Sequence, residues 1–228
     1  MRRNIALIPA AGVGARFGAD KPKQYVVIHG KTVLQHTLDI FINHTAIHHV
    51  AVVLSPEDNY FQTASSCERV SILRCGGASR AETVRNGINV LLGKGVAALE
   101  DNILVHDAAR CCLPEQALDR LIESAGSRSE GGILAVPVAD TLKRADAGQQ
   151  VEETVSRDGL WQAQTPQLFQ AALLQRALSG DLDKVTDEAG AVEALGIRPF
   201  LVEGDSRNLK LTLPQDEYIV RLLLSDNL

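Results

Sequence analysis

The chain has 228 residues, 22% of them charged and 4% aromatic, and its formal net charge at pH 7 is −5. The length predicts a single domain over 1–228 with a large core, and the composition excludes a disordered chain. The negative charge argues against general nucleic-acid binding, and no apolar run approaches the ~20 residues of a membrane span. The four cysteines lack paired spacing, which is typical of a protein in the reducing cytoplasm.

Short apolar runs alternate with amphipathic segments along the chain. This alternation predicts a Rossmann-like α/β fold, in which a mostly parallel twisted sheet carries helices on both faces. Ser79 and Glu82 have capping-box spacing, so one helix should begin there. Strands are expected at 5–8, 50–54, 70–73, 103–105, 133–136 and 200–202. Helices are expected at 33–42, near Tyr60, at 79–92, from Pro114 to about 125, at 168–178, at 187–195, and from Pro214 onward, the last with Ile219, Leu222 and Leu223 on one face.

The stretch 140–159 interrupts this alternation and is poor in apolar residues. Segments 141–144 and 151–155 flank a turn-like Asp146-Ala147-Gly148, which indicates a polar β-hairpin. An isolated hairpin is marginal in water, so this one must pack against its own subunit or against a partner. A loose surface excursion is the alternative.

The first strand leads into a loop of small residues, P-A-A-G-V-G-A-R-F-G over 9–18, with K-P-K-Q at 21–24. Small residues let a backbone turn tightly and point its N–H groups inward. Three cations, Arg16, Lys21 and Lys23, follow closely. Backbone donors and fixed positive charge are what a polyphosphate requires, so the loop predicts a nucleotide-triphosphate site. A plain glycine-rich turn with solvated lysines is the alternative.

Two commoner phosphate loops do not fit this stretch. The dinucleotide pattern G-x-G-x-x-G needs a glycine where Phe17 stands, and an acidic residue after the second strand, where Ser55 stands. The P-loop pattern needs Lys directly after its last glycine, but Gly18 is followed by Ala19. Ligands of such sheets bind beyond the carboxyl ends of the strands, where the first loop, the Gly76-Gly77 loop and Asp107 all fall. These segments can therefore converge on one site.

The first loop and K-P-K-Q resemble the signature of the sugar-nucleotide-type nucleotidylyltransferases. Three later segments, V-H-D-A-A-R at 105–110, Q-T-P-Q at 164–167 and N-L-K-L-T at 208–212, narrow this resemblance. Together they are similar to the 2-C-methyl-D-erythritol 4-phosphate cytidylyltransferase family of the non-mevalonate isoprenoid pathway. The resemblance runs from about Ile5 to about Leu224, and four segments in the family's order are far more specific than any one.

The resemblance implies transfer of CMP from CTP to methylerythritol phosphate, with Mg²⁺ as cofactor and pyrophosphate as the other product. The attacking phosphate is already anionic, so catalysis reduces to holding two anions together and stabilising the charge of the transition state. The resemblance also implies a homodimer, in which the arm at 138–160 pairs with its counterpart and completes the neighbour's active site.

The resemblance assigns Arg16 and Lys23 as stabilisers of the transition state, each contributing roughly 3–4 kcal/mol. Lys21 lies close by and is either a ligand of the phosphates or a solvated lysine. Asp107 would hold Mg²⁺, because phosphate oxygens and waters supply the remaining ligands; a helix cap is the alternative. His106 is expected to be structural, and the cluster His44, His48 and His49 to be surface histidines rather than metal ligands.

Further residues match family positions that bind the two substrates. Arg157 and Lys210 would orient the phosphate of methylerythritol phosphate, with Thr141 and Arg157 reaching across the dimer. From spacing alone, each is an ordinary surface residue. The base would be read mostly through backbone groups and the Thr83 hydroxyl, and the preference for cytosine follows from the resemblance only. The substrate-positioning set is Arg110, Thr141, Arg157, Thr165 and Lys210, and the nucleotide-binding set is Pro9, Ala10, Ala11, Gly12, Gly14, Gly76, Gly77, Thr83 and Asp107.

The sequence departs from the family pattern at two places. Cys111 stands where the family commonly has proline, which removes a fixed φ and is expected to loosen Arg110 slightly. Ala78 stands where an acidic residue often follows the two glycines, so a side-chain contact to the nucleotide is expected to be missing. Two alternatives remain: a cytidylyltransferase for another polyol phosphate such as ribitol 5-phosphate, and a non-catalytic nucleotide-binding protein on the same fold.

Overall fold

The computed structural model of the chain describes residues 2–12, 21–62 and 68–225. Its central sheet contains β1 (Asn4–Pro9), β4 (His49–Val53), β5 (Val70–Leu73), β6 (Asn102–Val105), β7 (Gly132–Pro137), β10 (Trp161–Gln170) and β11 (Phe200–Glu203). The seven strands lie in the order β11-β7-β10-β6-β1-β4-β5. Only β10 runs antiparallel to its neighbours among these strands. The predicted mostly parallel sheet is confirmed.

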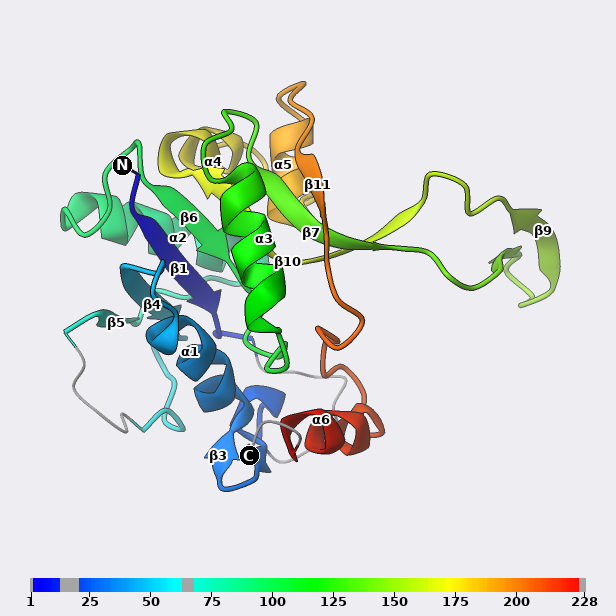
Figure 1. Cartoon of the computed structure of the whole chain (residues 1–228), viewed down its shortest axis with the longest axis horizontal. Helices are drawn as coiled ribbons and strands as arrows, with labels where there is room; N and C mark the ends of the chain where they lie inside the picture. The colour runs from blue at the N-terminus through cyan, green and yellow to red at the C-terminus, as the bar shows by residue number, and fades with distance from the viewer. Residues whose placement is uncertain (1, 13–20, 63–67, 226–228) are drawn as a thin grey trace.

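Helices cover both faces of the sheet, as predicted (Figure 1). In β1, Ala6 and Ile8 face one layer while Ile5 and Leu7 face the other, and all four are fully buried. A strand covered on both faces is hydrophobic at every position, which explains the continuous apolar run. The first layer is α1 (Val33–Asn43) with α3 (Glu115–Ala125), and the second is α2 (Arg80–Gly93), α4 (Ala171–Ala177) and α5 (Glu188–Glu193).

The predicted start of α2 is confirmed by its cap. Ser79 is the N-cap, and its Oγ accepts a hydrogen bond from the backbone N of Glu82 at 3.1 Å. The Glu82 carboxylate in turn accepts from the backbone N of Ala78 at 2.8 Å. Because the cap consumes N–H groups that a helix cannot satisfy internally, it fixes where the Gly76-Gly77 loop ends.

One predicted helix, near Tyr60, is absent from the residues described there, and another begins later than predicted. The segment around Tyr60 forms a turn, because the Asp58 carboxylate accepts from the backbone N of Tyr60 and of Phe61 and competes with helical pairing. The helix expected at 168–178 begins only at Ala171, and Leu168 and Phe169 belong to β10 instead. A short apolar run has no periodicity that separates a buried strand from a buried helix, which is why β10 was missed.

The C-terminal helix α6 (Asp216–Ser225) exists as predicted but buries a different face. Val220 and Leu224 are buried, whereas Ile219 and Leu222 are about half exposed. The apolar face predicted from the sequence is therefore shifted by one residue from the face that α6 buries. The buried side packs in a small third core with Val33, with the Cys111-Cys112 segment and with Ile28 of β2 (Val27–Ile28), which pairs with β3 (Lys31–Thr32).

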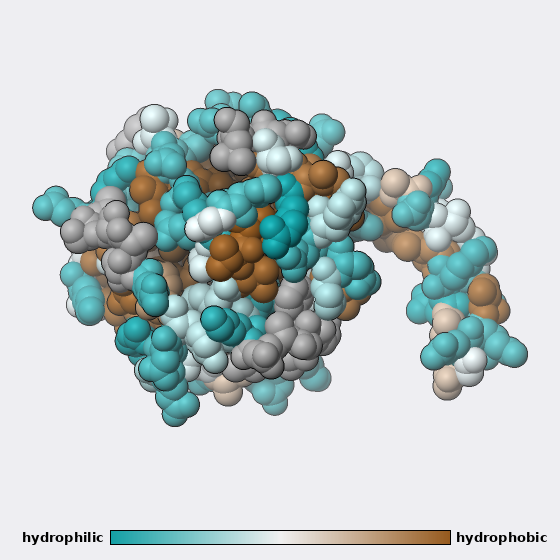
Figure 2. Space-filling view, turned by 90° about the horizontal axis from the view of Figure 1, so that it is seen from below, coloured by the Kyte–Doolittle hydropathy of each residue, from teal (hydrophilic) through white to brown (hydrophobic). Residues whose placement is uncertain are grey.

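The predicted polar hairpin is present and projects from the body of the molecule (Figure 1). Its strands β8 (Leu142–Ala145) and β9 (Val151–Val155) pair antiparallel, and Asp146 caps the turn by accepting from the backbone N of Gly148 and Gln150. The surface of the arm is mostly hydrophilic (Figure 2). Across the described ranges, no helix combines the length and apolarity that crossing a membrane requires.

Candidate active site

A cavity of about 520 Å³ lies at the carboxyl ends of β1 and β6 and beside the N-terminus of α2. It brings together the first loop, the Gly77 loop, Lys23, Asp107 and Lys210, which are far apart in the sequence. Its lining residues are Pro9, Ala10, Ala11, Gly12, Lys23, Gln24, Gly77, Ala78, Ser79, Arg80, Thr83, Asp107, Ala108, Ala109 and Lys210.

The two glycine-bearing loops are packed against each other and against the sheet. A Cβ added at Gly76 would lie 2.3 Å from the Cβ of Ala11, so only glycine fits there. Ala10 N donates to Val53 O, and Gly76 N donates to Leu54 O, both at 2.8 Å. Gln24 donates to the carbonyls of Ala10 and Gly12 at 3.0 and 2.9 Å. Gln24 therefore holds the first loop from behind, and sequence reasoning gave it no role.

Thr83, expected to read the base, is 2% exposed and engaged within its own loop. Its hydroxyl donates to Ser79 O at 2.9 Å and accepts from Gly77 N at 3.1 Å. Because a hydroxyl has one hydrogen and two lone pairs, one acceptor position remains for a ligand donor. Thr83 thus shapes the Gly77 loop first, and any contact with a base is limited to accepting a hydrogen bond.

Asp107 is the one carboxylate that lines the described part of the cavity, and cations surround it. Arg80 Nε lies 2.9 Å from Oδ1, and Lys210 Nζ lies 2.9 Å from Oδ2. Arg110 Nε is 3.6 Å from Oδ2, too far for a hydrogen bond, and has no hydrogen-bond partner among the described residues. Burial opposes ionisation, but Arg80 and Lys210 outweigh it and hold the pKa of Asp107 well below its usual range.

Behind Asp107, a chain of buried hydrogen bonds runs through His106 and Thr165. His106 Nε2 lies 2.9 Å from Arg110 O, which can only accept, so the ring carries its proton there. Nδ1 then accepts from the Thr165 hydroxyl at 3.0 Å, and this hydroxyl accepts from Asp107 N at 3.1 Å. Thr165, predicted to position the substrate, is 5% exposed, and its hydroxyl holds the backbone of Asp107. His106 is structural, as the sequence suggested.

The remaining predicted residues fall into three groups. Arg110 donates to Asn208 O at 2.5 Å, beside the cavity. Thr141 and Arg157 lie at the base of the arm and do not line the cavity, and Arg157 donates to the backbone oxygen of Ala139. Gly14 and Arg16 lie outside the described residues.

The site fits a divalent cation. Mg²⁺ binds through one or two carboxylates together with substrate phosphates and water, and Asp107 is an ionised carboxylate at the cavity wall. Another candidate cluster, His44 with Glu115 and Asp119, lies elsewhere. Ala46 N donates to His44 Nδ1, so the neutral ring carries its proton on Nε2, which faces Asp119 at 3.1 Å. The nitrogen that faces the carboxylates therefore has no lone pair for a metal ion.

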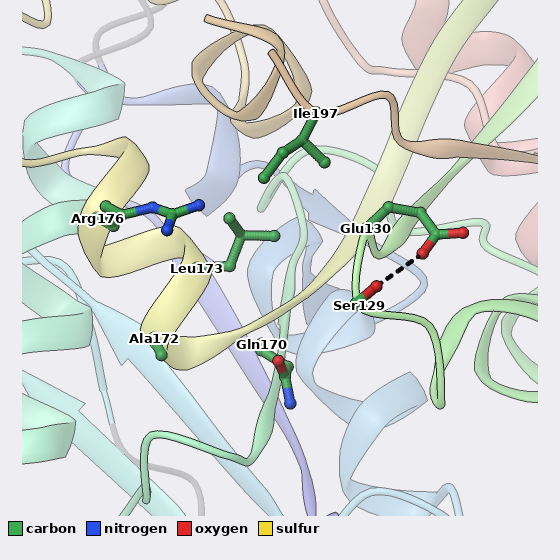
Figure 3. A pocket seen from close by; sticks show the side chains of 7 residues that line it. All are labelled: Ser129, Glu130, Gln170, Ala172, Leu173, Arg176 and Ile197. Carbon is green, nitrogen blue, oxygen red and sulfur yellow. Dashed lines mark hydrogen bonds between the residues drawn. The ribbon is translucent and has the colours of Figure 1, made fainter. Parts of the chain in front are cut away.

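A second hollow, of about 360 Å³, is lined by residues near the start of α4 (Figure 3). Leu173 and Ile197 supply apolar surface there, and Ser129 donates to Glu130. None of the predicted site residues within the described ranges lines it. This second hollow is therefore not part of the site predicted from the sequence.

The family model described as 2-C-methyl-D-erythritol 4-phosphate cytidylyltransferase matches residues 4–226. The chain belongs to this family. It is 66% identical over 226 residues to the 2-C-methyl-D-erythritol 4-phosphate cytidylyltransferase of Neisseria gonorrhoeae strain NCCP11945, with 98% of each chain covered. A crystal structure of a 4-diphosphocytidyl-2C-methyl-D-erythritol synthase is 61% identical, with a TM-score of 0.88 over 98% of this chain and 100% of that chain. The Francisella tularensis cytidylyltransferase is 35% identical, with a TM-score of 0.83 over 97% and 99%.

The two departures from the pattern of this cytidylyltransferase family have structural counterparts. Cys111 and Cys112 are buried in the third core, and the Arg110 that precedes them is anchored on Asn208 O. Next to Ala78, the Glu82 carboxylate binds the backbone N of Ala78, and a Cβ added at Gly77 would collide with it. An acidic group does lie beside the Gly77 loop, but α2 supplies it.

Two residues of this cytidylyltransferase site, Arg80 and Glu188, were not predicted from the sequence. Arg80 lines the cavity and binds Asp107, while its Nη1 and Nη2 bind the two oxygens of Glu188 at 2.7 and 3.0 Å. The Glu188 side chain is fully buried. Only one signal pointed to Arg80: it follows the capping serine at a strand end that faces the site.

His106 makes stability depend on pH in a defined window. Burial lowers its pKa from 6.5 to about 4, so between these values the unfolded chain binds more protons than the folded one. Acidification from pH 7 to pH 5 should therefore remove about 2 kcal/mol of the free energy of unfolding through this group. Urea unfolding of wild type and His106→Gln at both pH values measures the difference. An equal loss in the variant would assign the pH dependence to other groups.

Proposed function

We propose that the chain transfers the cytidylyl group of CTP to 2-C-methyl-D-erythritol 4-phosphate and releases pyrophosphate. The observation that carries the proposal is the cavity itself, in which Arg80 and Lys210 bind one ionised carboxylate, and Lys23 lines the wall beside a glycine-rich loop. Such a cavity suits a nucleoside triphosphate, a phosphomonoester and a divalent cation. The family match over 4–226 supports the identity of both substrates.

In the proposed reaction, an oxygen of the substrate phosphate attacks the α-phosphorus of CTP. A new P–O bond forms, and the bond from the α-phosphorus to the bridging oxygen of the β-phosphate breaks, so that pyrophosphate leaves with the electron pair. No proton has to be removed from the attacking oxygen. His106, with both ring nitrogens engaged and its pKa lowered by burial, is accordingly not needed as a base.

Catalysis then rests on positioning and on charge. Lys23 and Arg16 stabilise the developing negative charge, and Lys210 and Arg110 hold the phosphate of the second substrate. The backbone of the first loop and of the Gly77 loop holds the nucleotide. Asp107 holds Mg²⁺, which neutralises phosphate charge when bound.

The net charge of −5 and the unpaired cysteine spacing favour a cytoplasmic enzyme without a nucleic-acid or membrane partner.

The projecting arm supports a homodimer in which 138–160 of each subunit reaches the other. A hairpin this exposed and polar gains little from its own subunit. Thr141 and Arg157 lie on the arm and away from the cavity lining of their own subunit. Contact with the partner's cavity would give both residues a substrate to bind.

Mixing two inactive variants tests this exchange. If Arg157 serves the partner, a mixed dimer of Lys23→Ala and Arg157→Ala has one intact site, formed by the body of the second variant and the arm of the first. Co-refolding equal amounts should then recover about one quarter of wild-type activity, because half of the dimers are mixed. No recovery, with mixed dimers demonstrated by mass spectrometry, would place Arg157 at its own subunit's site.

Pyrophosphate release from the purified protein with CTP and Mg²⁺ tests the function itself. Methylerythritol 4-phosphate and ribitol 5-phosphate are supplied in parallel, and release with the first alone is expected. Release with ribitol 5-phosphate alone would keep the reaction but replace the substrate. Silence with both substrates, despite measurable CTP binding, would favour a non-catalytic nucleotide-binding protein.

A further inference from the structure

The two carboxylate oxygens of Asp107 are held by cations of very different freedom. Oδ1 is bound by Arg80 Nε at 2.9 Å, and Oδ2 is bound by Lys210 Nζ at 2.9 Å. The two distances are equal. The difference lies in what holds each cation in turn.

Arg80 is locked from behind. Its Nη1 and Nη2 bind both oxygens of Glu188, whose side chain is 0% exposed. A guanidinium bound in this bidentate way cannot rotate without leaving a buried carboxylate unpaired. Through Arg80, the start of α5 therefore fixes the position of Asp107 Oδ1.

The start of α5 is itself anchored to the sheet. Gln167 of β10 donates to Asp187 Oδ2 at 2.9 Å and accepts from Ala189 N at 2.8 Å. Asp187 also caps the helix by accepting from Gly190 N at 2.9 Å. Glu188 lies between these anchored residues, so its carboxylate is a rigid part of the scaffold.

Among the residues that the structure describes, none holds Lys210 in a comparable way. Its side chain is 39% exposed, and an ammonium on a four-carbon stem moves without breaking a fixed fork of hydrogen bonds. Lys210 can leave Oδ2 at small cost, whereas Arg80 cannot leave Oδ1. The two oxygens of Asp107 are therefore inequivalent toward an incoming cation.

We infer that Glu188 is a positioning residue: through Arg80 it immobilises Asp107 Oδ1 and leaves Oδ2 as the oxygen that exchanges Lys210 for a nucleotide-bound divalent cation. The inference rests on the proposed function. The exchange has a second consequence, because the Lys210 that leaves Oδ2 becomes available to the phosphate of the other substrate. Lys210 thus neutralises the charge of Asp107 before the complex of nucleotide and cation binds, and it binds the phosphate of the second substrate afterwards.

Calorimetric titration with CTP, with and without Mg²⁺, tests the inference without any turnover. In Glu188→Gln, the amide nitrogen faces a guanidinium nitrogen, so the bidentate lock is lost and Asp107 is no longer fixed. The tightening of CTP binding by Mg²⁺ should then shrink about tenfold, the lower range for loss of a residue behind a metal ligand. The Mg²⁺ concentration for half-maximal turnover should rise by a similar factor, with the KM for methylerythritol phosphate unchanged at saturating Mg²⁺, where Lys210 has left Oδ2.

Two further variants separate positioning from folding. The double change Arg80→Met with Glu188→Met removes the buried pair as a unit, which is often neutral for stability, and should show the same loss of Mg²⁺ response in a protein that melts normally. Glu193→Gln, the same substitution on the exposed side of α5, should behave as wild type. A wild-type Mg²⁺ response in both Glu188→Gln and the double variant would overturn the inference. Failure of the wild-type protein to bind CTP would overturn the proposed function instead.

Discussion

Lys23→Ala is expected to lower the turnover number by roughly 10²–10³, the usual cost of removing one preorganised donor to a transition-state charge. Lys23 opens the 3-10 helix Lys23–Tyr25 and lines the cavity. Its Nζ donates to Leu211 O at 2.8 Å, which places the ammonium beside the Lys210 segment. Pyrophosphate release at saturating CTP measures the effect.

Lys31→Ala is the matched control for this variant. Lys31 is an exposed lysine outside the cavity, paired with Asp39 at 2.6 Å, so its loss should leave turnover unchanged. Both variants should keep the wild-type melting temperature and the oligomeric state of the wild type. Near-normal turnover of Lys23→Ala would remove Lys23 from the mechanism.

Much of the fold could be predicted because the hydrophobic pattern has a single consistent interpretation. The apolar run 5–8 is too short for a helix and is followed by proline and glycine, which favours a strand covered on both faces, and the Ser79 cap is local chemistry. The errors occur where the pattern is degenerate. Leu168 and Phe169 are apolar in either a strand or a helix, and α6 carries enough apolar residues to present two faces. Tertiary packing on Leu211 and Val33 selects Val220 and Leu224.

The candidate site was predictable only in part, for a physical reason. Strand ends and small residues locate the loops, because both are properties of short segments. The lock between Arg80 and Glu188 joins residues 108 positions apart, and nothing local marks Glu188 as more than a helix-start carboxylate. Likewise, the resemblance assigns Thr165 to the substrate, but nothing local predicts that its hydroxyl donates to His106 and accepts from Asp107 N.

Asp107→Asn is expected to lower turnover by about 10³, the upper range for loss of one preorganised group, because it removes the metal-binding charge and the shared anion of three cations at once. Asparagine keeps the shape of the side chain and accepts from Arg80 through its oxygen, so the fold should survive. CTP binding without Mg²⁺ should strengthen, since Arg80 and Lys210 then face the phosphates without a competing carboxylate. The added tightening by Mg²⁺ should largely disappear.

Asp119→Asn is the matched control for Asp107→Asn, because it makes the same substitution at the other candidate metal cluster. Asp119 is a carboxylate of the other candidate cluster, 3.1 Å from His44, and lies outside the cavity. If Asp107 carries the metal, Asp119→Asn should keep wild-type turnover and Mg²⁺ response while Asp107→Asn loses both. The reverse pattern would move the metal to the His44 cluster. Loss of turnover in Asp107→Asn with the Mg²⁺ response of CTP binding intact would leave Asp107 as an organiser of cations only.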